Sequence, residues 1–177
     1  MSTNRKARLH KVFAGVACFL ICLGASLGIL YLLPASSAAA QTAAAHSASD
    51  PWTSSGTIQA AELANDLKSG KESEKPVVVC VGFHTLYEGA HVPGAIFHGP
   101  ASTSAGLDDL MHWAQSAPRS ANIVIYCGCC PLSHCPNIRP AFKALHSMGF
   151  THLRALLLPQ DFATDWVAKG YAVGKGK

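Results

Sequence analysis

Two short apolar stretches constrain the fold of this chain more than any other feature. Residues 76–81 read Pro-Val-Val-Val-Cys-Val, and residues 122–126 read Asn-Ile-Val-Ile-Tyr. A strand with one face in water alternates apolar and polar side chains, so continuous runs rich in β-branched residues indicate strands that are buried on both faces. Such strands occur in parallel sheets with helices on both sides. The sequence therefore predicts an α/β fold.

Helical periodicity alternates with strand-like segments along the chain. Apolar residues recur at helical spacing in three segments, residues 60–69, 104–117 and 138–148. Ser104 is the expected N-cap of the second helix. Further strands are expected at residues 95–97 and 152–158, followed by a short final helix that includes Trp166. This order predicts a parallel sheet that is covered by helices on both faces.

The excess of basic residues is confined to the N-terminus. Four of the fourteen Lys and Arg residues lie within residues 5–11, and no acidic residue precedes Asp50. From Asp50 onward, ten basic residues balance ten acidic residues. The net charge of +4 therefore does not indicate a nucleic-acid-binding surface, and we expect no nucleic-acid partner.

An apolar run of 22 residues, 12–33, follows these cations. As a helix it would be roughly 33 Å long, and the hydrocarbon core of a bilayer is about 30 Å thick. Residues 1–33 are therefore expected to be a signal peptide or a transmembrane signal anchor that exports the rest of the chain to the periplasm or another extracytoplasmic space. Residues 38–40 are three alanines, which offer a cleavage site, whereas the length of the run favours an uncleaved anchor in the membrane. Both outcomes remain open.

The chain after this run divides into a linker and one domain. Residues 34–50 are rich in Ala, Ser and Thr and carry no large apolar residue, so they are expected to be a flexible linker. Residues 51–177 have the length of one ordinary domain.

The residues with reactive side chains directly follow the second buried strand. Residues 127–140 read Cys-Gly-Cys-Cys-Pro-Leu-Ser-His-Cys-Pro-Asn-Ile-Arg-Pro and lead into the helix expected at residues 138–148. The carboxyl ends of parallel strands are where ligands bind, and the next helix directs free N–H groups to that point. We expect Cys127 to ionise easily there, and the thiolate is the nucleophilic form of cysteine. Arg139, in the first turn of the helix, would add positive charge.

The domain resembles the rhodanese-like family of sulfurtransferases from about Trp52 to Val173. Four stretches carry the resemblance: residues 58–63, 88–95 and 123–127, and residues 149–150 together with 166–171. The resemblance implies a sheet of roughly five parallel strands with helices on both faces. It also places Cys127 at the position of the family's persulfide-forming cysteine and Arg139 at that of the arginine that ends the active-site loop. No cofactor is expected.

The sequence also departs from the family pattern. Arg139 follows Cys127 by twelve residues, where members of the family usually have five. Cys80 occupies the usual place of an aspartate, and Gly82 that of an arginine. The relatives that use a cysteine, five residues and an arginine for phosphoryl chemistry are not matched. The resemblance therefore implies sulfur chemistry without naming the substrate.

Three functions fit the cysteine-rich loop. In the first, Cys127 takes sulfane sulfur from a small donor, the loop stabilises the charge, and a thiol acceptor removes the sulfur. The loop residues concerned are Gly128, Cys129, Cys130, Ser133, His134 and Cys135. In the second, Cys127 and Cys130 form a redox C-x-x-C pair.

In the third, the domain is a non-enzymatic module that carries sulfur or holds a soft or borderline metal such as Cu(I) or Zn²⁺, because thiolate and imidazole are suitable ligands. The candidate ligands are Cys127, Cys130, His134 and Cys135. The loop cysteines can also form a structural disulfide, with Cys135 paired to Cys129 or Cys130. Cys80, in a valine-rich strand, is expected to be an inert core residue.

Overall fold

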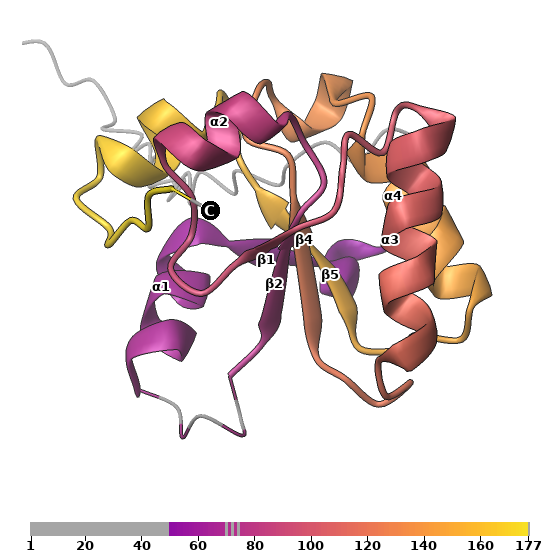
Figure 1. Ribbon diagram of the computed structural model, residues 1–177. Helices are drawn as coiled ribbons and strands as arrows, with labels where there is room; N and C mark the ends of the chain where they lie inside the picture. The colour runs from indigo at the N-terminus through magenta and orange to yellow at the C-terminus, as the bar shows by residue number, and fades with distance from the viewer. Residues whose placement is uncertain (1–49, 70, 72, 74, 177) are drawn as a thin grey trace, which may run out of the picture. The chain divides into compact units, whose positions relative to one another are not determined.

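The computed structural model describes residues 50–176, except residues 70, 72 and 74 (Figure 1). The expected signal or anchor at residues 1–33, and the expected linker up to residue 49, lie outside the described residues. Within the described part of the chain, no helix combines the length and the apolar character needed to cross a bilayer.

Five parallel strands form one sheet, in the order β1-β5-β4-β2-β3. The strands are β1 (Thr57–Gln59), β2 (Val77–Cys80), β3 (Ile96–Phe97), β4 (Ile123–Tyr126) and β5 (Leu153–Leu157). The central strand β4 is buried along its whole length, as its apolar sequence requires. The α/β fold predicted from the buried strands is thereby confirmed.

The helices cover both faces of this sheet (Figure 1). The elements are η1 (Ser54–Gly56), α1 (Ala60–Ser69), α2 (His84–Gly89), α3 (Ser104–Ser116), η3 (Leu132–His134), α4 (Ile138–Ser147) and η4 (Ala163–Val167). Leu110 of α3 and Leu145 of α4 pack in one core with Ile125 of β4. Leu63 of α1 and Trp166 of η4 pack in a second core on the other side. Val124, the neighbour of Ile125 in β4, belongs to this second core, so successive residues of the strand point into different cores.

The boundaries differ from the predicted ones mainly where capping decides them. Thr103, rather than Ser104, is the N-cap of α3: its backbone is extended, and its Oγ1 accepts a hydrogen bond from the Gly106 N–H at 3.1 Å. Ser104 is already helical, so the predicted cap was wrong by one residue. The short elements β1 and α2 were not predicted, because three and six residues are too few to show a period.

Candidate active site

Cys127 lies directly after β4, at the carboxyl edge of the sheet, and is 4% exposed. Asn137, the residue before α4, donates a hydrogen bond from Nδ2 to the Cys127 sulfur at 3.2 Å. The Asn137 side chain is fully buried, and its Oδ1 accepts a hydrogen bond from the Ser102 N–H at 2.8 Å. Both ends of the amide are therefore fixed, with the donor end directed at the sulfur.

The loop thiols gather around the same sulfur. The Sγ atoms of Cys127 and Cys129 are 3.2 Å apart, and those of Cys129 and Cys130 are 3.1 Å apart. The sulfur atoms of Cys127, Cys129 and Cys135 all lie within 4.8 Å of one another. All four loop cysteines are free thiols in this structure, which does not contain the alternative disulfide between Cys135 and Cys129 or Cys130.

Within this cluster the pKa of Cys127 is lowered, and the pKa values of Cys129 and Cys135 are raised. The pKa of Cys127 is lowered to about 6, mainly because the Cys135 thiol donates a hydrogen bond to its sulfur; this outweighs the effect of burial. Hydrogen bonds from the backbone and thiol of Cys129 and from Asn137 lower the same pKa further. The pKa of Cys135 is raised, first by the hydrogen bond that it gives to Cys127, and burial raises that of Cys129. At neutral pH, Cys127 is therefore the thiolate of the cluster.

The N–H groups at the start of α4 reach a different sulfur from the one expected. The backbone N–H groups of Asn137 and Ile138 hydrogen-bond to Cys135, whereas the Asn137 side chain serves Cys127. The start of the helix thus acts on Cys127 through the Cys135 thiol and through the amide of Asn137.

Arg139 is placed where it ties the loop to the beginning of the domain. Its Nη2 donates hydrogen bonds to Asp50 at 2.5 Å and to the Ser133 carbonyl at 2.9 Å. Its Nη1 donates to the Cys135 carbonyl at 3.3 Å, and the guanidinium lies 5.7 Å from the centre of the Trp52 ring. These contacts position the loop; a direct role of Arg139 in turnover stays a prediction.

The remaining predicted loop residues lie at the edge of the site. Ser133 and His134 are exposed, and Ser133 Oγ is 2.9 Å from His134 Nδ1. His134 is not part of the ligand group that the described residues form, which consists of Cys127, Cys129 and Cys135. Gly128 has a φ of +86°, and a Cβ there would lie 3.1 Å from the Phe162 side chain, so both conformation and space favour glycine.

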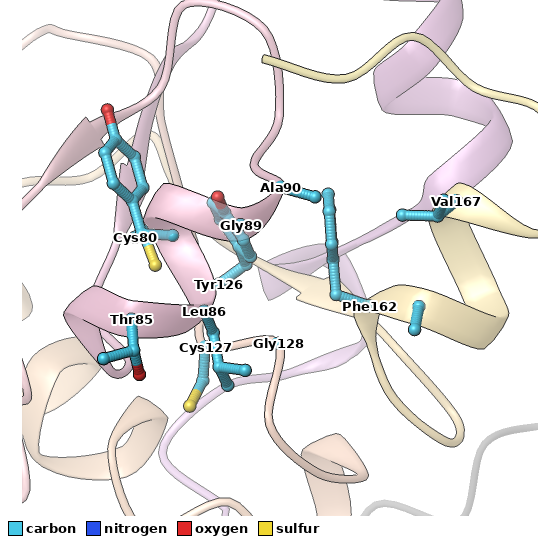
Figure 2. A pocket seen from close by; sticks show the side chains of 12 residues that line it. Cys80, Thr85, Leu86, Gly89, Ala90, Tyr126, Cys127, Gly128, Phe162 and Val167 are labelled. Carbon is cyan, nitrogen blue, oxygen red and sulfur yellow. The ribbon is translucent and has the colours of Figure 1, made fainter. Parts of the chain in front are cut away.

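A cavity of about 230 Å³ opens beside Cys127 (Figure 2). One part of its wall consists of Cys80, Tyr126, Cys127 and Gly128, at the ends of β2 and β4, and the rest consists of residues between 85 and 90 and between 162 and 167. Gly82 makes room on another side of the cysteine, because a Cβ on it would lie 2.2 Å from the Cys127 carbonyl oxygen. The missing arginine of the family pattern thus coincides with a close approach of two backbones.

Sequence reasoning missed the role of Asn137 and the walls of this cavity. Asn is a common residue before a helix, and that signal predicts a cap rather than a sulfur contact. In the structure, Asn137 makes no side-chain cap hydrogen bond, which leaves its amide for Cys127 and Ser102.

The sequence matches no known protein-family profile and no curated protein. Solved structures do resemble this chain. The rhodanese-like domain of the Anabaena sp. Alr3790 protein aligns at 23% identity with a TM-score of 0.50, over 68% of this chain and 79% of that one.

Two other solved structures align over similar lengths. A crystal structure of the Anabaena Alr3790 protein aligns at 20% identity and a TM-score of 0.52, over 67% of this chain and 92% of that one. The Bacillus halodurans BH2092 protein aligns at 22% identity with a TM-score of 0.53, over 68% of this chain and 77% of that one. This chain has a rhodanese-like fold. The rhodanese-like fold confirms the architecture that the sequence resemblance implied, and it places the cysteine-rich loop at the carboxyl end of the central strand.

Proposed function

We propose that the protein is an exported sulfurtransferase that holds sulfane sulfur as a persulfide on Cys127 and passes it to a thiol acceptor. The observation that carries this proposal is the set of hydrogen bonds from Asn137, Cys129 and Cys135 to one buried sulfur at the strand end. Such donors stabilise a thiolate, which is the form that attacks sulfur. Export rests on the cations and the apolar run within residues 1–33.

The transfer takes two displacement steps. The Cys127 thiolate attacks the outer sulfur of a donor, a new S–S bond forms, and the donor's own bond to that sulfur breaks, with the electron pair leaving on the remainder of the donor. An acceptor thiolate then attacks the outer sulfur of the persulfide and regenerates the Cys127 thiolate. Nδ2 of Asn137 and the N–H of Cys129 stabilise the negative charge on the Cys127 sulfur at the start and end of this cycle.

A second candidate function is the binding of a soft metal ion, which is favoured by the three sulfur atoms within 4.8 Å of one another. Thiolates suit Cu(I) and Zn²⁺, but the ligand set that the geometry favours is Cys127, Cys129 and Cys135, instead of one that includes His134. Metal analysis of the full chain after anaerobic purification tests this candidate. One equivalent of bound metal would favour it over sulfur transfer.

For the redox alternative, the geometry favours a different partner from the one expected. Cys127 contacts the thiols of Cys129 and Cys135, whereas Cys130 contacts Cys129. A disulfide of Cys127 would therefore form with Cys129 or Cys135 rather than with Cys130.

Persulfide labelling tests the proposed function directly. The reduced full chain is incubated with one equivalent of a sulfane donor, and peptide mass spectrometry locates the added sulfur. Because Cys129 can remove that sulfur again, the test is run in the Cys129→Ser background. We expect one sulfur on Cys127, and none when Cys127→Ser is added. Sulfur found on another cysteine, or on none, would contradict the proposal.

A further inference from the structure

The cavity beside Cys127 has uncharged walls. Of the twelve described residues that line it, none is Asp, Glu, Lys, Arg or His. Its three titratable residues other than Cys127 are also neutral near pH 7: burial raises the pKa of Cys80 to about 11 and also raises the pKa of Tyr87 and of Tyr126. An anionic substrate in this cavity would therefore meet no positive side chain among the lining residues.

The mouth of the cavity carries exposed apolar side chains. Leu86 of α2 is 46% exposed, and Val167 at the end of η4 is 40% exposed. Both line the cavity. Large apolar side chains that gather in the open around one cavity mark a binding site for apolar groups.

Carboxylates occupy three N–H groups in the segment around Phe162. Asp165 accepts hydrogen bonds from the N–H groups of Gln160 at 2.6 Å and Asp161 at 3.1 Å. Asp161 accepts one from the Thr164 N–H at 2.7 Å. These N–H groups are not free to bind an oxyanion, and the two carboxylates add negative charge next to Phe162 in the chain.

The size of the cavity suits one small apolar group. At about 230 Å³ it exceeds the cavity of about 150 Å³ that holds benzene in an engineered protein interior. Phe162 of its wall is 6% exposed and belongs to the second core, with its ring 5.8 Å from that of Trp166. Part of the wall is thus a packed aromatic side chain against which a ring can lie.

We propose that the sulfur donor of this site carries an apolar aryl or alkyl group, which occupies this cavity while its sulfane sulfur meets Cys127. The inference rests on the proposed sulfur transfer and adds the class of donor. For a thiosulfonate donor, the Cys127 thiolate attacks the terminal sulfur, the bond between that sulfur and the sulfonyl sulfur breaks, and the sulfinate leaves with the electron pair. Cys127 is left as a persulfide, and no oxidant or reductant is consumed.

Three donors with the same sulfane sulfur test the inference: thiosulfate, methanethiosulfonate and benzenethiosulfonate. The rate of persulfide formation by the full chain is measured with each and divided by the rate at which free cysteine reacts with the same donor. We expect the corrected kcat/KM for the phenyl donor to exceed that for the methyl donor by about tenfold, which is typical of discrimination by an apolar pocket. Thiosulfate is expected to be the poorest of the three.

Substitutions at the cavity mouth make the test specific. Leu86→Ser and Val167→Ser are each expected to lower the phenyl-to-methyl ratio by about threefold or more, within the range for lost apolar contacts. Val77→Ser is the matched control, since Val77 is 39% exposed and lies at the opposite, amino end of β2. It should leave the ratio unchanged.

The outcomes separate the two proposals. Persulfide formation with no preference for the phenyl donor, or with a preference that neither mouth variant changes, would overturn the inference while leaving sulfur transfer intact. A preference for thiosulfate would also overturn it. If none of the three donors places sulfur on Cys127, the proposed function fails, and the inference fails with it.

Discussion

The side-chain amide of Asn137 lies 3.2 Å from the sulfur of Cys127, although the two residues belong to different elements of the site. Asn137 precedes α4, and Cys127 follows β4. The bond from Ser102 to the other end of the amide prevents it from turning away. One fully buried side chain therefore connects the strand end, the helix start and the loop before α3, and it favours the thiolate.

The pH dependence of alkylation tests this arrangement. Because the pKa of Cys127 is lowered to about 6, its reaction with iodoacetamide should be half-maximal near pH 6, compared with about pH 8.5 for a free cysteine. Replacing Asn137 with Ala removes a donor to the thiolate and should move the midpoint upward. Peptide mass spectrometry across a pH series measures both proteins. Cys80 is an internal control, since burial raises its pKa to about 11.

The same lowered pKa links stability to pH. A thiol whose pKa is lower in the folded chain stabilises the fold fully above its unfolded pKa of about 8.5, and this contribution is lost as the pH falls to about 6. The difference in unfolding free energy between wild type and Cys127→Ser should therefore shrink over that interval. A difference that stays constant would contradict the assignment of Cys127 as the thiolate.

Cys129 is expected to resolve the persulfide. Its sulfur lies 3.2 Å from that of Cys127, so after losing its proton Cys129 can attack Cys127 Sγ and expel sulfide, leaving a Cys127–Cys129 disulfide. Because the pKa of Cys129 is raised, this step should be faster at higher pH. After one equivalent of donor, without an acceptor thiol, the wild-type chain should lose the mass of two hydrogens. Cys129→Ser should instead keep the added sulfur, and the matched variant Cys130→Ser should behave like wild type. Stable added sulfur on the wild type would refute the resolving step.

Arg139 is expected to act on the site by holding the loop. Arg139→Ala removes its bonds to Ser133 and Cys135 and leaves the largely buried Asp50 unpaired, so we expect a loss of about 1–2 kcal/mol in unfolding free energy. Turnover should fall less than in Cys127→Ser. Asp50→Asn keeps an acceptor for the guanidinium and should have a smaller effect. If Arg139→Ala abolishes transfer without loss of stability, the arginine acts on the substrate instead.

Export is tested by a topology reporter. The cations at residues 5–11 and the apolar run at residues 12–33 predict that everything after the run leaves the cytoplasm. A reporter that is active only outside the cytoplasm, fused after Val173, should be active. Reversing the charge of the four cations should reduce that activity. An active cytoplasmic reporter at the same position would contradict the expectation.

The sequence predicted the central strands well because burial on both faces gives short continuous runs that are rich in β-branched residues. It also predicted the position of Cys127 at the end of β4, since that position follows from the strand itself. The environment of Cys127 was not predictable in the same way. Arg139 pairs with Asp50, 89 residues earlier in the chain, and no local pattern records such a partner.

The walls of the cavity escaped prediction for a related reason. α2 has only six residues, and η4 has only five. Neither is long enough to show which side chains face Cys127. Only the folded chain brings Leu86 and Val167 to the same opening.

The most direct test compares donor-dependent sulfide release by Cys127→Ser with release by Cys135→Ser, each checked for folding by circular dichroism. Serine has nearly the size of cysteine but a far less acidic and less sulfur-reactive oxygen, so Cys127→Ser should fall to background. Cys135→Ser loses the thiol that most lowers the pKa of Cys127 but should remain active, with a rate that recovers as the pH rises. An active Cys127→Ser together with an inactive Cys135→Ser would show that Cys135 is the nucleophile and would contradict this account.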